Sequence, residues 1–193
     1  GVDLEYFAPA AAAPESPPSV VFTGQMDYPP NVEAVRWFVR EVWPALERQA
    51  GGLRFRIVGR QPVRPVRQLA DVPGVEVTGA VPDVRPFLSA ATAAVVPLRL
   101  ARGIQNKVLE AMAMARPVVA SPAALEGLEV TPGREALAAE TPDEWREAVL
   151  RLLREPALGA RLGESARRCV EDRYSWPARM APLVDLCLKL AGD

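Results

Sequence analysis

Hydrophobic residues occur in short continuous runs along this chain, and between the runs they recur every three or four positions. A continuous apolar run bounded by turn residues is typical of a buried parallel strand, whereas the longer spacing is typical of helices. Strands are predicted over residues 19–23, 53–58, 75–78, 93–97, 117–120 and 135–139. Because helical segments alternate with these strands, we expect an α/β fold with a doubly wound parallel sheet of about six strands and helices on both faces.

Local signals place the helices that follow the first strands. Asn31 is a favourable N-cap for a helix that reaches about Gln49, and Pro44 is expected to kink that helix. Shorter helices are predicted within residues 62–71 and over residues 83–90.

The C-terminal part of the chain is predicted to be helical throughout. Thr141 and Glu144 have the spacing of a capping box at the start of one helix. Pro156 is expected to begin a second helix that reaches about Arg173, and a last helix is predicted over residues 178–190.

The composition changes along the chain and predicts three regions. Residues 1–18 contain many Ala, Pro and Ser residues, as linkers between domains do. Residues 19–140 carry the alternating strands and helices, and we expect them to form the sheet domain. Residues 141–193 are expected to form helices that pack on that same domain.

The loop, helix and strand over residues 99–121 bring charged side chains to a helix start. Helical spacing predicts an apolar face toward the sheet and, beside it, a stripe that contains both charged residues. The apolar face would consist of Ile104, Val108, Ala111 and Ala115, and the stripe of Gly103, Lys107, Glu110 and Met114.

This stripe predicts a binding site for a nucleotide. A helix that starts at the C-terminal end of a parallel strand offers unpaired N–H groups and a positive dipole to a phosphate. Gly103 would let the ligand approach closely, Lys107 adds a positive charge, and Glu110 can accept hydrogen bonds from ribose hydroxyls. The alternative is that Lys107 and Glu110 form an ordinary i,i+3 pair on the surface.

Composition narrows the classes of function. The net charge of −1, from 23 basic and 24 acidic residues, provides no footprint for nucleic acid. The chain has no histidine, so it lacks the commonest general base and metal ligand, and we expect no metal in this domain. Cys169 and Cys187 have no metal-ligand spacing and are expected to be free thiols. Without an apolar span or a signal peptide, the chain is expected to be soluble and cytoplasmic.

The run from Gly103 to Ser121, with Leu-Glu-Ala-Met-Ala followed by Pro-Val-Val-Ala, resembles the group 1 family of retaining glycosyltransferases, which use nucleotide sugars. The residues match the C-terminal half of the two-domain GT-B architecture, so the resemblance implies a Rossmann-like domain. Gly1-Val-Asp-Leu-Glu-Tyr-Phe-Ala-Pro is similar to the interdomain linker. Val20 to Gly24 is similar to the first strand and glycine loop, and Val75 to Gly79 to the strand before the base pocket.

The resemblance implies roles for individual residues. Glu110 matches the second glutamate of a Glu-x7-Glu motif that holds the donor ribose, and the backbone at Gly103 and Ile104 matches the diphosphate cradle. Lys107 and Glu110 are the expected catalytic residues. The expected donor-binding residues are Gly24, Gly79, Ala80, Val81, Arg102, Gly103, Ile104, Gln105, Asn106, Lys107 and Glu110.

The sequence departs from the family pattern at two places. The first glutamate of the motif is replaced by Arg102, which predicts either an acidic donor sugar or an arginine that faces water. The arginine and lysine that usually follow the first glycine loop are absent between Gly24 and Asn31, and Lys107 is expected to supply that charge.

By resemblance, the chain is expected to be the donor-binding half of a glycosyltransferase, closest to bacterial transferases of exopolysaccharide gene clusters. Expected partners are a donor such as a UDP-sugar and an N-terminal acceptor domain of the same protein, which could also contact a membrane peripherally. The half alone is expected to be inactive and to need no cofactor.

One alternative is a stand-alone nucleotide-sugar-binding module. Another is a dinucleotide-binding oxidoreductase domain, but the loop after the first strand lacks Gly-x-Gly-x-x-Gly.

Overall fold

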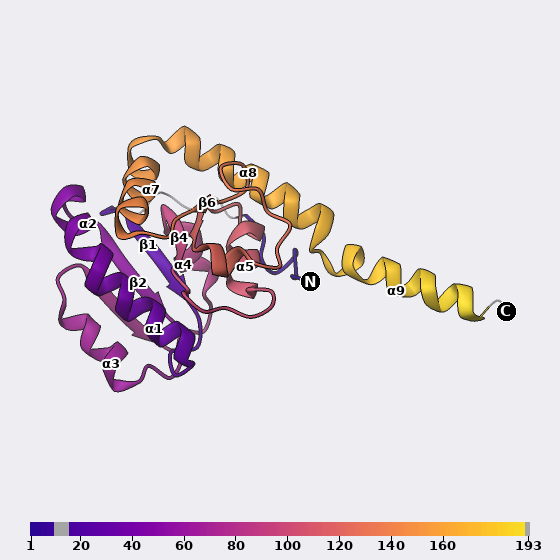
Figure 1. Ribbon diagram of the computed structural model, residues 1–193, viewed down its shortest axis with the longest axis horizontal. Coiled ribbons are helices and arrows are strands. Elements are labelled where there is room, and N and C mark those ends of the chain that lie inside the picture. The colour runs from indigo at the N-terminus through magenta and orange to yellow at the C-terminus, as the bar shows by residue number, and fades with distance from the viewer. Residues whose placement is uncertain (10–15, 192–193) are drawn as a thin grey trace.

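The computed structural model describes residues 1–9 and 16–191 and contains a six-stranded sheet (Figure 1). The strand order is β3-β2-β1-β4-β5-β6, and every neighbouring pair is parallel. The strands are β1 (Ser19–Thr23), β2 (Arg54–Val58), β3 (Val75–Gly79), β4 (Ala93–Val96), β5 (Val118–Ala120) and β6 (Leu137–Ala138). The order reverses between β1 and β4, which confirms the predicted doubly wound α/β fold.

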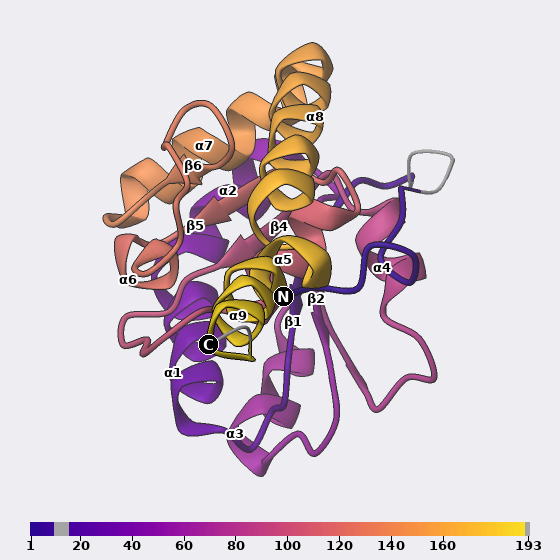
Figure 2. The ribbon, with the colours of Figure 1, turned by 90° about the vertical axis from the view of Figure 1, so that its right-hand side faces the viewer.

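Helices cover both faces of this sheet, as right-handed crossovers require. On one face α1 and α2 form an almost continuous rod to which α7 is added, and on the other face α8 packs against α5 (Figure 2). The helices are α1 (Pro29–Trp37), α2 (Trp43–Ala50), α3 (Arg64–Arg67), α4 (Arg85–Ala90), α5 (Asn106–Ala113), α6 (Pro122–Leu125), α7 (Pro142–Arg154), α8 (Pro156–Arg173) and α9 (Trp176–Ala191).

The core lies between the sheet and these helices, and aromatic side chains join its parts. The residues of β1 and β4 are buried along their whole length, as their apolar runs predict. Phe38 stacks at a tilt on Phe55 of β2 with ring centroids 4.8 Å apart, and Trp145 of α7 meets Phe38 edge to face at 5.7 Å. Helix α7 is therefore anchored in the same core as the sheet.

The structure corrects two predictions about the first helix. Helix α1 begins at Pro29, and Asn31 is a buried residue of its first turn rather than its N-cap. Pro44 does not bend a regular helix; instead, residues Phe38–Val42 just before it form one π-helical turn. A proline has no N–H to donate to the preceding turn, so a change in hydrogen bonding at that point is expected.

The predicted capping box at the N-terminus of α7 is confirmed. The Thr141 hydroxyl accepts from the Glu144 N–H at 3.3 Å, and the Glu144 carboxylate accepts from the Thr141 N–H at 3.0 Å.

Helix α9 starts at Trp176, slightly earlier than predicted, and extends away from the rest of the molecule (Figure 1). Among the described residues, no helix is both long enough and apolar enough to cross a membrane.

The N-terminal residues lie against the domain. Val2 is buried and forms an isolated parallel bridge with Ser175, between α8 and α9. Arg167 of α8 donates at 2.8 Å to the carbonyl of Phe7. Residues that the sequence predicts as linker thus contact the C-terminal helices.

A close approach of backbones fixes α8 on the sheet domain. A Cβ atom added to Gly163 would lie 2.1 Å from the carbonyl oxygen of Ala115, which follows α5 with a φ of +53°. We expect Gly163→Ala to lower the free energy of unfolding by about 2 kcal/mol or more, because two backbones must separate. The matched control is Gly159→Ala on the same helix, where the nearest atom, Pro117 Cγ, is at 3.4 Å.

Urea denaturation of both variants checks this prediction. Gly159→Ala should leave the free energy of unfolding unchanged or raise it by up to about 1 kcal/mol, because alanine favours helix. Equal stabilities of the two variants would show that α8 does not pack on α5 as described.

Candidate functional site

A cavity of about 550 Å³ lies at the carboxyl ends of the first strands. In doubly wound sheets, ligands bind at this edge, near the point where the strand order reverses. The walls come from the loops after β1, β2 and β3, from the start of α5, and from the N-terminal segment. The lining residues are Tyr6, Phe7, Thr23, Gly24, Gln25, Asn31, Val58, Gly59, Arg60, Ala80, Val81, Pro82, Asp83, Val84, Gln105, Asn106, Lys107 and Glu110.

The loops after β1 and β2 touch each other at two glycines. A Cβ atom on Gly59 would lie 1.6 Å from the carbonyl oxygen of Gly24, so no side chain fits there. The Gly24 N–H donates to the Val58 carbonyl at 3.0 Å, and the Met26 N–H donates to the Arg60 carbonyl at 2.8 Å. The two loops therefore form one rigid wall of the cavity.

Lys107, near the start of α5, is held inside the cavity by a residue of α1, on the other face of the sheet, and by a residue of strand β1. Its Nζ donates to Asn31 Oδ1 of α1 at 2.6 Å and lies 4.7 Å from the centre of the Phe22 ring. Asn31 Nδ2 in turn donates to the carbonyl of Gln25 at 2.9 Å. Burial lowers the pKa of Lys107 to about 8, because water is withdrawn from the ammonium, and nearby Glu110 opposes that shift.

Glu110 follows one turn later on α5 and faces the same cavity. Burial raises the pKa of its carboxyl group, while the charge of Lys107 acts in the opposite direction. Lys107 donates its hydrogen bond to Asn31, and no ion pair within 4.0 Å joins Lys107 to Glu110. The two side chains therefore do not form the ordinary surface pair that was the alternative interpretation.

The rim of the cavity is built by the N-terminal segment and the loop after β3. The Arg85 guanidinium lies 3.9 Å from the centre of the Tyr6 ring and forms an ion pair with Asp83 at 2.7 Å. The hydrogen bonds from Arg85 lower the pKa of Asp83. Arg85 also donates to the carbonyl of Tyr6 at 3.1 Å, so the segment is tied to the loop.

The structure gathers most of the predicted donor-binding residues in this cavity. Those that line it are Gly24, Ala80, Val81, Gln105, Asn106, Lys107 and Glu110. Those that do not line it are Gly79, Arg102, Gly103 and Ile104. Gly79 ends β3 with a φ of +72° and turns the chain toward Ala80.

The helical spacing predicts that Gly103 and Ile104 belong to the helix that contains Lys107, and this prediction is wrong. Because the helix begins at Asn106, Arg102, Gly103 and Ile104 lie in the exposed loop after β4. Ile104 is 41% exposed and does not belong to the apolar face, which also excludes Ala115. The face buried by α5 consists of Val108, Leu109, Ala111, Met112 and Ala113. Lys107 accordingly lies beside Gly24, whose added Cβ would be 3.3 Å from Nζ, and not beside Gly103.

Several lining residues were not predicted from sequence. Arg60 follows a glycine at the end of a predicted strand, the same signal that singled out Gly24, and could have been found in that way. The sequence predicts a capping role for Asn31, and nothing local in the sequence shows that it contacts Lys107. Tyr6 and Phe7 lie in the predicted linker and reach the site only through tertiary contacts.

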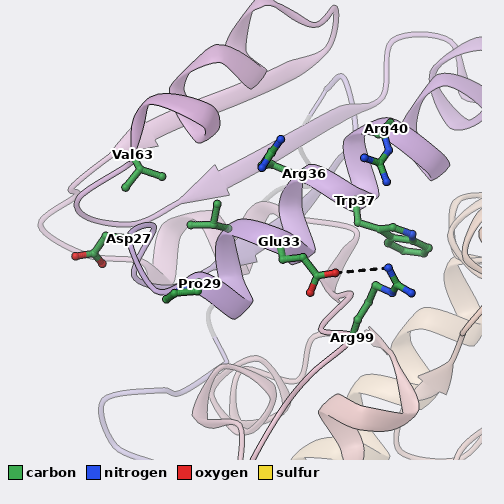
Figure 3. Close-up of a pocket in the computed structure, with 9 residues that line it drawn as sticks. Asp27, Pro29, Glu33, Arg36, Trp37, Arg40, Val63 and Arg99 are labelled. Atoms are coloured by element: carbon green, nitrogen blue, oxygen red, sulfur yellow. Dashed lines mark ion pairs between the residues drawn. The ribbon is translucent and has the colours of Figure 1, made fainter.

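A second pocket, of about 400 Å³, lies on the outer side of α1 (Figure 3). Arg99, from the loop after β4, forms an ion pair with Glu33 there at 3.5 Å, and Arg40 pairs with Glu41 at 2.5 Å. The side chains of Arg40 and Arg99 are 71% and 60% exposed. Because water screens these charges and carboxylates already pair with them, the cavity that contains Lys107 is the stronger candidate site.

In the described part of the chain, no three acidic or cysteine side chains are grouped to hold a metal ion.

Solved structures share this fold. Sucrose-phosphate synthase from Thermosynechococcus elongatus matches with a TM-score of 0.79 and 23% identity, over 100% of this chain and 51% of that one. HepE from Anabaena, in complex with UDP, matches with a TM-score of 0.79 and 13% identity, over 98% of this chain and 56% of that one. The C-terminal domain of a group 1 glycosyl transferase, LpcC from Francisella tularensis, matches with a TM-score of 0.70 and 16% identity, over 91% of this chain and 100% of that domain.

The chain spans 51% to 56% of the two longer proteins, so it corresponds to about half of each. No curated protein sequence matches it significantly. The family model described as glycosyl transferases group 1 matches residues 17–155, which include the whole sheet and the cavity residues from Thr23 to Glu110. The chain belongs to the group 1 family of glycosyl transferases.

Proposed function

We propose that this chain binds the nucleoside diphosphate of a sugar donor in the cavity that contains Lys107 and Glu110. The observation that carries the proposal is the Lys107 ammonium, held by Asn31 at 2.6 Å inside a cavity at the switch point of the sheet. A partly buried cation with no carboxylate in direct contact has a charge that an anionic ligand can neutralise.

The start of α5 supports a phosphate at this position. Gln105, Asn106 and Lys107 all line the cavity, so the helix begins at its wall. The unpaired N–H groups and the dipole of a helix N-terminus favour negative charge there. When the sugar leaves, the diphosphate gains negative charge, and a fixed cation in a site shielded from water stabilises that charge.

The remaining parts of the donor are assigned by position in the proposal. Glu110 accepts hydrogen bonds from the ribose hydroxyls, since its carboxylate has no hydrogen bond to the described residues and lies one helical turn from Lys107. Ala80 and Val81, after β3, contact the base. UDP is the proposed nucleotide because the solved HepE structures contain UDP and UDP-glucose.

The proposal extends to the longer protein. An N-terminal acceptor domain would complete the transferase, and the chain alone would bind the donor without transferring sugar, because one wall of a two-domain cleft is missing. A role in bacterial exopolysaccharide synthesis and peripheral membrane contact through the other half are further parts of the proposal that rest on the sequence resemblance. A cytoplasmic location is also proposed, from the composition of the chain.

Replacement of Glu110 separates ribose binding from phosphate binding. We expect Glu110→Gln to weaken UDP binding about ten-fold, because it removes a charge-assisted acceptor for the ribose. Inorganic pyrophosphate lacks the ribose, and its binding should be unchanged or tighter, since a negative charge is removed beside Lys107. Calorimetric titration of both ligands measures this, with Glu164→Gln on the exposed surface of α8 as control. Equal losses for UDP and pyrophosphate would contradict the ribose assignment.

The pKa of Lys107 predicts how binding depends on pH. The free ammonium loses its proton near pH 8, whereas the phosphate groups are already ionised above about pH 7. UDP affinity should therefore fall as the pH rises, by about ten-fold between pH 7 and 9.5. In Lys107→Met the affinity should be low and almost independent of pH over that range. The same slope in the parent and in this variant would show that Lys107 does not contact the phosphates.

A further inference from the structure

Two cations line the cavity, and the segment that carries each of them lies close to Gly24. Among the described lining residues, Lys107 and Arg60 are the basic ones, while the lining residue Asp83 is already paired with Arg85. Lys107 Nζ lies near one side of Gly24, and Gly59, the neighbour of Arg60, touches the Gly24 carbonyl. A nucleoside diphosphate sugar carries two negative phosphates, so one ammonium neutralises only half of its charge.

The backbone of Arg60 is fixed at the cavity wall. Its carbonyl accepts from the Met26 N–H at 2.8 Å, and the Met26 carbonyl accepts from the Val63 N–H at 3.3 Å. Gln61, the next residue, has a φ of +57°, a backbone conformation that costs energy for a residue other than glycine. The loop after β2 is therefore held in a specific conformation that presents Arg60 to the cavity.

The side chain of Arg60, in contrast, is exposed and held by a neutral partner. Its Nη2 donates to Gln25 Oε1 at 3.1 Å, and Gln25 Nε2 donates to Gln61 Oε1 at 3.2 Å. No carboxylate lies within ion-pair distance of Arg60 among the described residues, whereas Arg85, at the rim of the cavity, pairs with Asp83. A neutral amide orients the guanidinium without satisfying its charge, and a planar guanidinium can bind a phosphate with two parallel hydrogen bonds.

We propose that Arg60 is a second phosphate-binding residue of this site, which holds the donor diphosphate from the loop after β2 while Lys107 holds it from α5. This inference rests on the proposed function and assigns a role to the loop after β2. The guanidinium exchanges its bond to Gln25 for bonds to phosphate oxygens when the nucleotide binds. Because Arg60 is exposed and Lys107 is partly buried, Arg60 makes the affinity depend more strongly on salt.

The test measures UDP, UMP and uridine binding by calorimetry to the 193-residue chain and its variants. Arg60→Gln should weaken UDP binding about ten-fold, weaken UMP binding less, and leave uridine binding unchanged. Arg60→Lys should recover part of the loss, because it retains the charge but not the planar fork. The control Arg64→Gln, on the exposed side of α3, should bind all three ligands as the parent does. UDP affinity should also depend less on salt in Arg60→Gln than in the parent.

Two results would overturn the role of Arg60. One is an Arg60→Gln variant that binds UDP as tightly as the parent. The other is an equal loss for UDP, UMP and uridine, which would make Arg60 a structural residue of the loop. Either result leaves the proposed function intact, since the parent still binds UDP. A parent chain that binds neither UDP nor GDP would overturn the proposed function and this inference together.

Discussion

The hydrogen bond between Lys107 and Asn31 connects the parts of the molecule that form the cavity. Asn31 belongs to α1 and Lys107 to α5, two helices on opposite faces of the sheet, and they meet where the strand order reverses between β1 and β4. For the side chains of Asn31 and Lys107 to come together, the residue at the end of β1 must be small. Gly24 meets this requirement, because a side chain there would contact both Asn31 and Lys107.

Burial of this ammonium is unfavourable for folding, and the molecule compensates only in part. Removal of water lowers the pKa of Lys107 to about 8, and a neutral amide and the face of an aromatic ring replace the lost hydration. A purely structural lysine would more often be paired with a carboxylate. Here Glu110 is near enough to influence the charge but not to form the ion pair, so both groups remain able to interact with a ligand. The cost in stability is physically consistent with a binding site.

The sequence predicts the fold well because the relevant information is local. The central strands β1, β4 and β5 are apolar runs, β2 and β3 alternate apolar and polar residues, and all six segments predicted as strands contain one, including the two-residue strand β6. The capping box at Thr141 is equally local and is confirmed. Gly103 and Ile104 continue the helical spacing and are therefore predicted to be helical, but the chain does not become helical before Asn106.

The candidate site could be predicted only where its residues share one helix. Lys107 and Glu110 are three positions apart, so the helical period places them on one side. Asn31 lies 76 positions before Lys107, so no helical period relates the two residues. Asn31 also does not cap its helix, because α1 already begins at Pro29 and Asn31 lies in its first turn. Tyr6 and Arg60 likewise reach the cavity through contacts between distant segments, and the periodicity of a helix or strand does not predict such contacts.

A crystal structure of the chain soaked with UDP tests the central claim most directly. The account predicts that the diphosphate lies within hydrogen-bond distance of Lys107 Nζ, at the start of α5, with the ribose hydroxyls at the carboxylate of Glu110. UDP bound instead in the arginine-lined pocket on α1, with Lys107 still bonded only to Asn31, would contradict it.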